Sequence, residues 1–163
     1  MRWSALLVLA ACSSALHEPR PVGQLAPGHA RGRSAGELVR EADLAWQHHA
    51  EPGQAARAQA LYLDAAAGDA RRTDALIGAM RAMSYRIEHE RGVARGTLAE
   101  QEVELGQWCQ RRAPQSGECD YRLAIALGQQ ARERSSTGHD ALGRMVTLLN
   151  RAIARAPALD AGG

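Results

Sequence analysis

The chain contains no phenylalanine and no lysine, and aromatic residues make up only 4% of its 163 residues. With so few aromatic and β-branched side chains, a β-sandwich or barrel would lack the residues that pack well on a pleated sheet. All 20 basic residues are arginine, and 18 acidic residues reduce the net charge to +2. A dedicated nucleic-acid-binding protein carries a larger, clustered basic excess, so no nucleic acid is expected as a partner. Alanine and arginine favour helices, and the length suits one domain, so the composition predicts a single all-α domain.

The first eleven residues, MRWSALLVLAA, combine a positive charge at Arg2 with an apolar run that ends just before Cys12. This pattern is typical of an export signal, and the run is too short to span a bilayer. The segment Leu9-Ala10-Ala11-Cys12 resembles a bacterial lipobox, in which small residues expose the bond before a cysteine that then receives diacylglycerol. We expect residues 1–11 to be a lipoprotein signal peptide and Cys12 to be lipidated; the alternative is an apolar helix with a chance cysteine. A start codon assigned too late would explain the shortness of the run.

Residues 12–34 are rich in proline and glycine and show no apolar periodicity. This composition predicts a flexible, semi-extended tether with a reach of about 25 Å, which would hold the domain away from the membrane. Because Ser13 rather than an aspartate follows Cys12, we expect an anchor on the periplasmic face of the outer membrane.

Residues 35–163 are predicted to form the domain, with apolar residues at helical spacing between Gly, Pro and Ser/Thr breaks. Six helices are expected, at about 35–49, 54–67, 69 or 73 to 91, 97–112, 119–134 and 140–156. Thr97 followed by Glu100 predicts a capping box at the start of the fourth. Six helices with short connections indicate three antiparallel hairpins, either a helical-repeat stack or an ordinary bundle.

Small residues at matching positions favour the repeat stack of tetratricopeptide type. Ala58-x3-Tyr62-x2-Ala65 in the second helix has the same spacing as Met145-x3-Leu149-x2-Ala152 in the sixth, which Pro157 follows. Gly128 in the fifth helix would allow a close helix crossing. An alanine-rich bundle remains the alternative.

Lipidation of Cys12 would leave two cysteines, Cys109 and Cys119, in an oxidising compartment. The residues between them include Pro114, Ser116 and Gly117, which favour a turn, so a bridge would close the corner between two helices. We predict a Cys109–Cys119 disulfide; the alternative is two separate buried thiols.

Several segments together resemble a known family. Tyr121-Arg122-Leu123-Ala124-Ile125-Ala126-Leu127-Gly128-Gln129-Gln130-Ala131-Arg132 is similar to a helix of the type Y-x-L-A-x-x-L-G-x-x-A-R, and Glu104-Leu105-Gly106 ahead of Pro114 matches the helix before it. The stretch from Leu149 to Gly163, ending in Gly162-Gly163, resembles a closing long helix followed by a Gly-Gly turn. With the lipobox, these features resemble the TatT-like lipoproteins, the T component of tripartite ATP-independent periplasmic (TRAP) transporters.

The resemblance implies a non-catalytic, membrane-tethered scaffold that associates with a periplasmic solute-binding protein and holds a small apolar or anionic ligand. In that family the Gly-Gly turn leads into a further helical segment, so a chain ending at Gly163 is expected to be a fragment. The Cys109/Cys119 pair is not general in the family, so we take it as the expected mark of a subgroup with a different partner.

The first helix of each repeat hairpin presents side chains on an inner surface. Aligning Gly128 with the helix crossing places four residues there: Arg122, Ile125, Gln129 and Arg132. The same alignment at Ser84 adds Gly78, Arg81, Tyr85 and Glu88. Since guanidinium groups bind carboxylates in a two-pronged geometry, we predict that Arg81, Tyr85, Arg122, Gln129 and Arg132 bind a carboxylate-bearing ligand or an acidic partner; the alternative is an ordinary solvated helix face.

No catalytic or metal motif is present: the sequence has no Gly-x-Ser-x-Gly elbow, phosphate loop, Cys-x2-Cys or His-x3-His. The adjacent His48 and His49 are expected to point to different sides of a helix, and His89 stands alone. We assign the large aromatic residues to core packing, namely Trp46, Tyr62, Trp108 and Tyr121. The sequence therefore predicts no enzyme, no metal and no cofactor.

The expected function is that of a periplasmic, lipid-anchored binding scaffold auxiliary to solute uptake. The alternative is a structural envelope lipoprotein that organises a protein assembly without a small ligand. Self-association is left open by the sequence.

Overall fold

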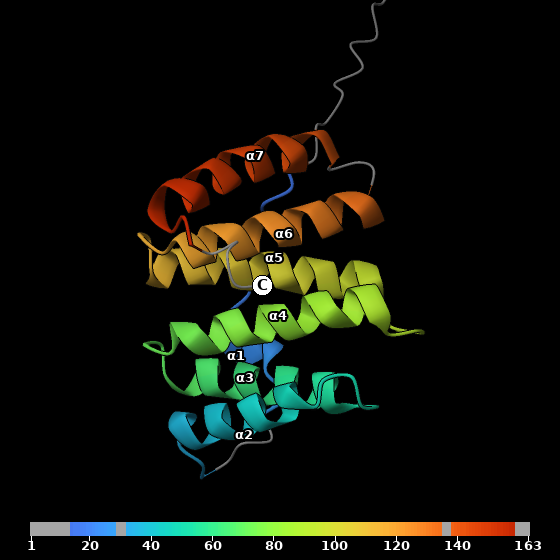
Figure 1. The fold of residues 1–163 in the computed structure, drawn as a ribbon, viewed down its shortest axis with the longest axis vertical. Coiled ribbons are helices and arrows are strands. Elements are labelled where there is room, and N and C mark those ends of the chain that lie inside the picture. The colour runs from blue at the N-terminus through green and yellow to red at the C-terminus, as the bar shows by residue number, and fades with distance from the viewer. Residues whose placement is uncertain (1–13, 29–31, 135–137, 159–163) are drawn as a thin grey trace, which may run out of the picture.

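The computed structural model describes residues 14–28, 32–134 and 138–158, and these residues form helices and no strand (Figure 1). The helices are α1 (Val22–Leu25), α2 (Ala35–Gln47), α3 (Gln54–Gly68), α4 (Thr73–His89), α5 (Arg95–Arg112), α6 (Gly117–Glu133) and α7 (Gly138–Arg155). The all-α prediction is confirmed, and the six predicted helices correspond to α2–α7. The short α1 was not predicted. None of the described helices has the length and apolarity needed to cross a membrane.

The helices stack in chain order as three hairpins, α2/α3, α4/α5 and α6/α7, with α2 and α7 at opposite ends (Figure 1). Each helix from α3 to α6 packs against both of its neighbours along the chain, and α4 also packs against α6. This open succession is that of a helical-repeat stack, because a closed bundle would bring the first and last helices together.

Glycines allow two of the helix contacts to be unusually close. A Cβ atom added at Gly78 of α4 would lie 2.7 Å from the ring of Tyr62, a core residue of α3. One added at Gly106 of α5 would lie 2.8 Å from Cδ1 of Leu123 on α6. In each case a large side chain of one helix occupies the space over a glycine of a neighbouring helix: Tyr62 of α3 over α4, and Leu123 of α6 over α5.

A disulfide joins the C-terminal hairpin α6/α7 to α5, and charge-assisted hydrogen bonds join α7 to α6. Cys109 at the end of α5 is bonded to Cys119 at the start of α6, with their Cα atoms 5.4 Å apart, so the predicted disulfide is confirmed. Asp120, which is buried, accepts hydrogen bonds from Arg151 at 2.6 Å and from Arg155 at 2.8 Å, both on α7. These charge-assisted bonds hold α7 on α6.

The predicted capping box at Thr97 and Glu100 is wrong. The helix α5 begins at Arg95, so Thr97 lies within its first turn, and its N-cap Ala94 makes no side-chain cap. A capping box occurs instead at α2, where Ser34 Oγ accepts the Glu37 N–H and the Glu37 carboxylate accepts the Ser34 N–H. Ser34 was assigned to the end of the tether, although it satisfies the open N–H groups of the first helix.

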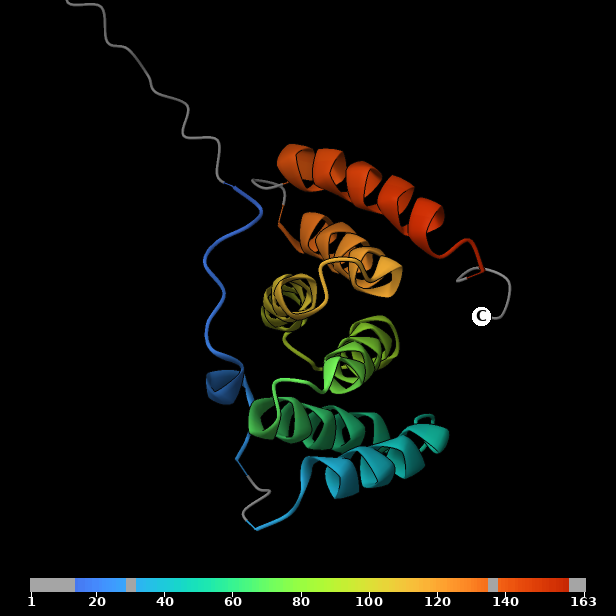
Figure 2. The ribbon, with the colours of Figure 1, turned by 90° about the vertical axis from the view of Figure 1, so that its left-hand side faces the viewer.

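Residues 14–28, which we call the strap, are not the free tether that the composition predicts. They run along one side of the stack, over α7, α5 and α3, before the chain reaches α2 (Figure 2). Ala15 and Val22 are buried among the core residues. Proline and glycine do exclude long helices here, but an extended segment can still pack on a surface made by other helices.

Hydrogen bonds hold the strap at successive helices. The N–H of Ala15 donates to Asp140 of α7 at 2.8 Å, and the carbonyl of Arg20 accepts from Trp108 Nε1 of α5 at 2.7 Å. The N–H of Gly28 then donates to Asp64 of α3 at 2.8 Å. Trp108, assigned to core packing, therefore also secures the strap. The predicted signal peptide, residues 1–11, and the predicted lipidation site Cys12 lie outside the described residues.

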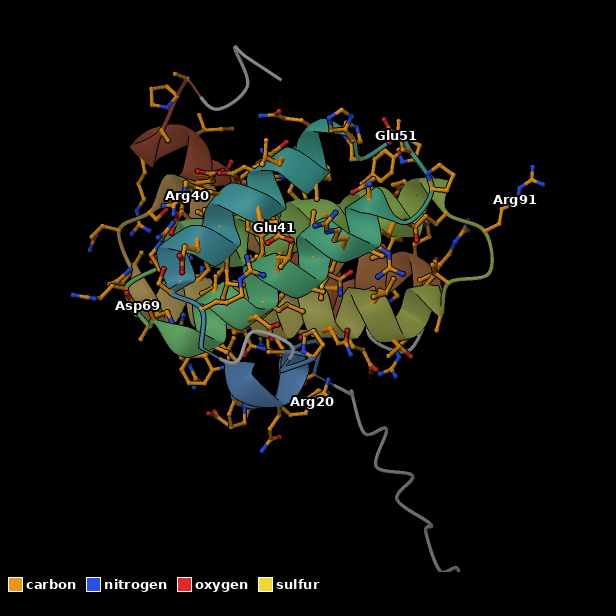
Figure 3. All side chains as sticks on the ribbon, turned by 90° about the horizontal axis from the view of Figure 1, so that it is seen from below. Arg20, Arg40, Glu41, Glu51, Asp69 and Arg91 are labelled. Carbon is orange, nitrogen blue, oxygen red and sulfur yellow. A yellow bond between two sulfur atoms is a disulfide. The ribbon has the colours of Figure 1, made fainter. Side chains whose placement is uncertain are left out.

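Charged residues of both signs lie at the α2 end of the stack (Figure 3); Arg40 and Glu51 are exposed, and Glu41 and Asp69 are half-buried. Glu41 joins α2 to α3, because its carboxylate accepts a hydrogen bond from Arg57 at 2.6 Å. Exposed ion pairs of this kind contribute little stability, so we ascribe the fold mainly to the alanine-rich helix contacts.

Candidate functional site

The first helices of the three hairpins, α2, α4 and α6, contribute polar side chains to one side of the stack, which we call the inner face. Along α4 its residues follow helical spacing: Asp74, Gly78, Arg81, Tyr85 and Glu88. The strap packs on α3 and α5 and so leaves α2 and α4 uncovered (Figure 2). The inner face contains two hollows, one around Arg81 and one around Tyr85.

The Arg81 hollow encloses about 290 Å³ between α2, α3, α4 and the start of α6. Its lining residues are Val39, Asp43, Tyr62, Asp74, Ile77, Gly78, Arg81 and Glu118. The guanidinium carbon of Arg81 lies 4.6 Å from the ring centre of Trp46, an arrangement that holds the cation over an aromatic face. Tyr62 Oη donates to Asp43 at 2.5 Å, and burial together with this carboxylate raises the pKa of Tyr62 to about 12.

Arg81 and Arg122 each have a buried Nε atom with no hydrogen-bond partner among the described residues. Burial lowers the pKa of Arg122, and the positive charge of Arg81 lowers it further, while Glu118, at 3.9 Å, opposes both effects. The positive charges of these two partly buried guanidinium groups are therefore close together and not fully balanced by carboxylates or hydrogen-bond acceptors. An unpaired buried donor costs free energy, which an anion placed between the two groups would recover.

Behind this pair lies Glu102 of α5, which is completely buried. Burial raises its pKa to about 8, although the hydrogen bond from Ser84 Oγ and the positive charge of Arg122 act in the opposite direction. Glu102 is therefore mostly protonated at neutral pH. In that state Glu102 does not neutralise Arg122. The inner face is therefore more positive than it would be if Glu102 carried its usual negative charge.

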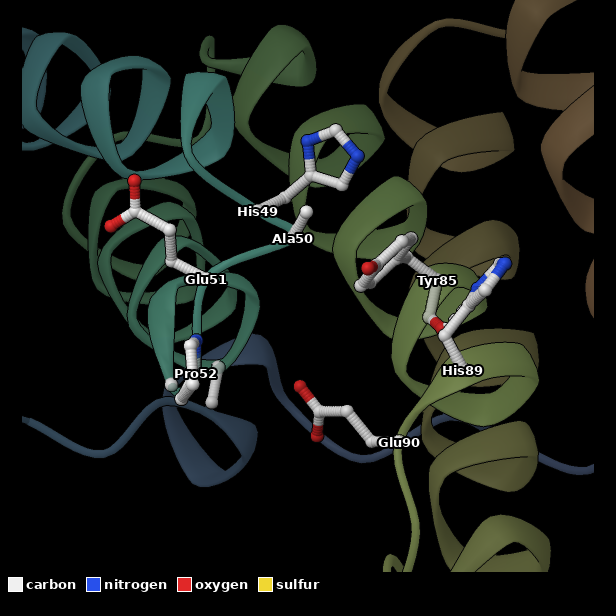
Figure 4. A pocket seen from close by; sticks show the side chains of 9 residues that line it. His49, Ala50, Glu51, Pro52, Tyr85, His89 and Glu90 are labelled. Atoms are coloured by element: carbon white, nitrogen blue, oxygen red, sulfur yellow. Dashed lines mark hydrogen bonds between the residues drawn. The ribbon is translucent and has the colours of Figure 1, made fainter.

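The Tyr85 hollow encloses about 230 Å³ between α4 and the turn from α2 to α3 (Figure 4). His89 stacks on Tyr85 with ring centres 4.4 Å apart, and His49 meets Tyr85 edge to face at 4.7 Å. Glu51 and Glu90 stand at its margin (Figure 4). Aromatic walls beside a few polar groups are typical of a small-ligand site.

The two histidines of this hollow share one orientation. His49 Nδ1 lies 2.8 Å from the carbonyl of Trp46, and His89 Nδ1 lies 3.0 Å from the carbonyl of Tyr85. Because a carbonyl oxygen only accepts, each Nδ1 carries the proton, and in the neutral ring Nε2 is an acceptor. Among the described residues no group of three or more potential ligands converges on a point suited to a metal ion.

Gln129 and Arg132 do reach the inner face, but both are engaged with α4. Arg132 binds the carboxylate of Glu88 with its closest contact at 2.8 Å, and Gln129 Nε2 donates to Glu88 at 3.4 Å. These contacts join α4 to α6 at one edge of the inner face. Of the five predicted binding residues, Arg81 and Tyr85 line the hollows and Arg122 lies near enough to Arg81 for their charges to interact. The other two, Gln129 and Arg132, join α6 to α4.

The sequence analysis missed Trp46, His49 and His89 as site residues. It assigned Trp46 to the core and treated the histidines as isolated. In the structure all three surround Tyr85, and the guanidinium of Arg81 also lies over the ring of Trp46. A partial signal exists, since Trp46 and His49 are three residues apart and so are close on a helical turn. Their contacts with Tyr85 and His89 depend on how far side chains of α2 and the turn after it reach toward α4, which spacing alone does not specify.

In comparisons with known proteins, the chain matches no family model, no curated protein and no solved structure.

Proposed function

We propose that this protein is a non-catalytic binding scaffold whose inner face takes a carboxylate-bearing small molecule or an acidic segment of a partner. The observation that carries the proposal is the pair of buried, unpartnered Nε atoms on Arg81 and Arg122, at the edges of two neighbouring helices. A carboxylate is the group that satisfies guanidinium donors best, because its two oxygens match their planar geometry.

The surroundings of the pair support binding more than catalysis. Arg81 is held by Trp46 and by a 3.5 Å contact to the hydroxyl of Tyr62, so its position is fixed before a ligand arrives. A preorganised cation loses little freedom on binding. The acid–base residues of the hollows are engaged in structural contacts, as Asp43 is with Tyr62, and none is paired with a nucleophile as acyl transfer requires.

The cellular setting of the proposal comes from the N-terminal sequence and the family resemblance. We propose that Cys12 is acylated after removal of residues 1–11, that the protein is held at the periplasmic face of the outer membrane, and that its partner is a periplasmic solute-binding protein. In this setting it would act as the T component of a TRAP transporter does, as an auxiliary to solute uptake.

Native mass spectrometry of protein purified from cells tests the binding function. We expect a co-purifying anion on the wild type and on the exposed control Arg40→Gln, and its loss from the double variant Arg81→Gln/Arg122→Gln. Glutamine keeps part of the side-chain volume while it removes both charges, so a folded double variant isolates the electrostatic contribution. A wild-type protein that purifies with protein partners only, and with no small molecule, would instead support a structural role in the envelope.

A further inference from the structure

The outer surface of α7 carries a row of large aliphatic side chains. Leu142, Val146 and Ile153 are 50%, 54% and 66% exposed, and Leu149 between them is partly buried. The adjacent face of the helix, with Ala141, Leu148 and Ala152, is buried. A single exposed leucine is ordinary, but a continuous row along one helix marks a surface that binds something apolar.

The internal repeat shows that the same positions are covered elsewhere in the fold. When Tyr62 of α3 is aligned with Leu149 of α7, the positions of Leu142, Val146 and Ile153 correspond to Ala55, Gln59 and Ala66. All three of these α3 residues are buried, and Gln59 accepts a hydrogen bond from Arg86 of α4. The position that α4 occupies on α3 is therefore open on α7 in the described structure (Figure 1), although α7 presents larger apolar side chains there.

The spacing of the four side chains fits the core positions of a coiled coil. Leu142, Val146, Leu149 and Ile153 are spaced by four, three and four residues, so the leucines fall at d positions and Val146 and Ile153 at a positions of a heptad. Leucine at d with β-branched residues at a favours a parallel two-stranded coiled coil. The e positions, Gly143 and Asn150, carry no charge, and Gly143 lies in open space.

We propose that α7 pairs in parallel with α7 of a second copy of this chain, along the row Leu142, Val146, Leu149 and Ile153. Two heptads are too short for an isolated coiled coil. Here α7 is already held as a helix on α6 by Asp120, so pairing need not supply the free energy of helix formation.

The strap gives a second reason for the parallel arrangement, and this reason rests on the proposed acylation of Cys12. The N–H of Ala15 donates a hydrogen bond to Asp140 in the first turn of α7. The three residue steps that separate Cys12 from Ala15 span at most about 11 Å when fully extended. In a parallel pair the two Ala15 residues lie at the same end of the dimer, so acyl groups attached three residues before them could enter one membrane. Sharing a membrane raises the effective concentration of the two copies, which favours an interface of this small size.

Sedimentation velocity on the full chain carrying Cys12→Ser tests the dimer without any contribution from lipid. We expect a concentration-dependent dimer over about 1 to 500 µM, a range suited to a small interface. The double variant Val146→Glu/Ile153→Glu should be monomeric throughout, because it places four carboxylates in the seam. The matched control Leu44→Glu changes a leucine that is 59% exposed on α2 and should leave the dimer intact.

A wild-type monomer at all these concentrations would overturn the proposal, and so would a dimer that the two glutamates leave unchanged. Binding of the monomer to anionic phospholipid vesicles through Val146 and Ile153 would also overturn it, since the occupant would then be a lipid surface. None of these outcomes depends on ligand binding at Arg81 and Arg122, so a failure here is distinct from a failure of the proposed function.

A cysteine at Leu142 tests the orientation. In a parallel pair, Leu142→Cys faces its own copy and should form an intermolecular disulfide under mild oxidation. In an antiparallel pair it would face Ile153, and the two introduced cysteines would be about 16 Å apart along the axis, because a helix rises 1.5 Å per residue. Cross-linking of Leu142→Cys only when it is mixed with Ile153→Cys would therefore refute the parallel arrangement.

Discussion

The contact between Gly78 and Tyr62 gives a quantitative test of the packing. In Gly78→Ala, the new Cβ would lie 2.7 Å from the Tyr62 ring, well inside normal contact distance. The ring cannot easily withdraw, because it is 2% exposed and its hydroxyl is bonded to Asp43 at 2.5 Å. The helices α3 and α4 must therefore separate slightly, or the ring must leave its preferred position.

Two opposing effects set the size of the change. Replacing glycine by alanine inside a helix stabilises by about 1 kcal/mol, whereas overpacking a filled core costs about 1 to 3 kcal/mol. We expect Gly78→Ala to lower the free energy of unfolding by about 0 to 2 kcal/mol. The control is Gly143→Ala in α7, where an added Cβ meets nothing within 4 Å, so only the propensity gain of about 1 kcal/mol remains.

Urea denaturation followed by circular dichroism measures both variants, and their difference isolates the packing cost from helix propensity. We expect this difference to be about 1 to 3 kcal/mol. Two variants that agree within about 0.5 kcal/mol would show that Tyr62 does not press on Gly78, and the close approach of α3 and α4 would be refuted.

Three further predictions concern the bridge, the buried acid and the strap. Replacing Cys109 and Cys119 by alanine should lower the free energy of unfolding by about 3 kcal/mol, and reductant should then no longer affect the urea midpoint, as it does in the wild type. Because burial raises the pKa of Glu102 to about 8 from its ordinary 4.5, the folded protein keeps a proton that the unfolded chain loses, so this group lowers stability as pH rises from about 4.5 to 8. The stability of Glu102→Gln should accordingly depend less on pH across that window, and urea midpoints that run parallel to the wild type would contradict the raised pKa. Val22→Asp should release the strap, seen as faster hydrogen exchange of residues 15–26, whereas unchanged protection there would mean that Val22 does not hold it.

Much of the fold could be predicted because its helices carry strong local signals. Apolar residues at helical spacing and breaks such as Pro52-Gly53 locate α2 to α7 within about two residues. The strap could not be predicted in this way, since its buried residues Ala15 and Val22 follow no period of their own. They are buried by surfaces that three distant helices create together, and a local pattern contains no information about such contacts.

The inner face was predictable in part for the same reason. Spacing along one helix placed Arg81 and Tyr85 correctly on the same side of α4, and Arg122 was assigned to the facing side of α6. Spacing did not reveal that Glu88 engages Arg132, because a salt bridge between helices depends on their relative offset along the axis. It also did not reveal the contact of Trp46 with Arg81, which depends on where α2 lies relative to α4.

The strap alters how this stack is expected to fold. In a simple repeat array each hairpin meets only its neighbours, so hairpins can form one after another along the chain. Here the bond between Ala15 and Asp140 joins positions 125 residues apart. The strap therefore cannot pack completely until α7 has folded. Contacts of such long sequence separation slow folding. In return, the two ends of the array unfold together, which changes a modular stack into a single cooperative unit.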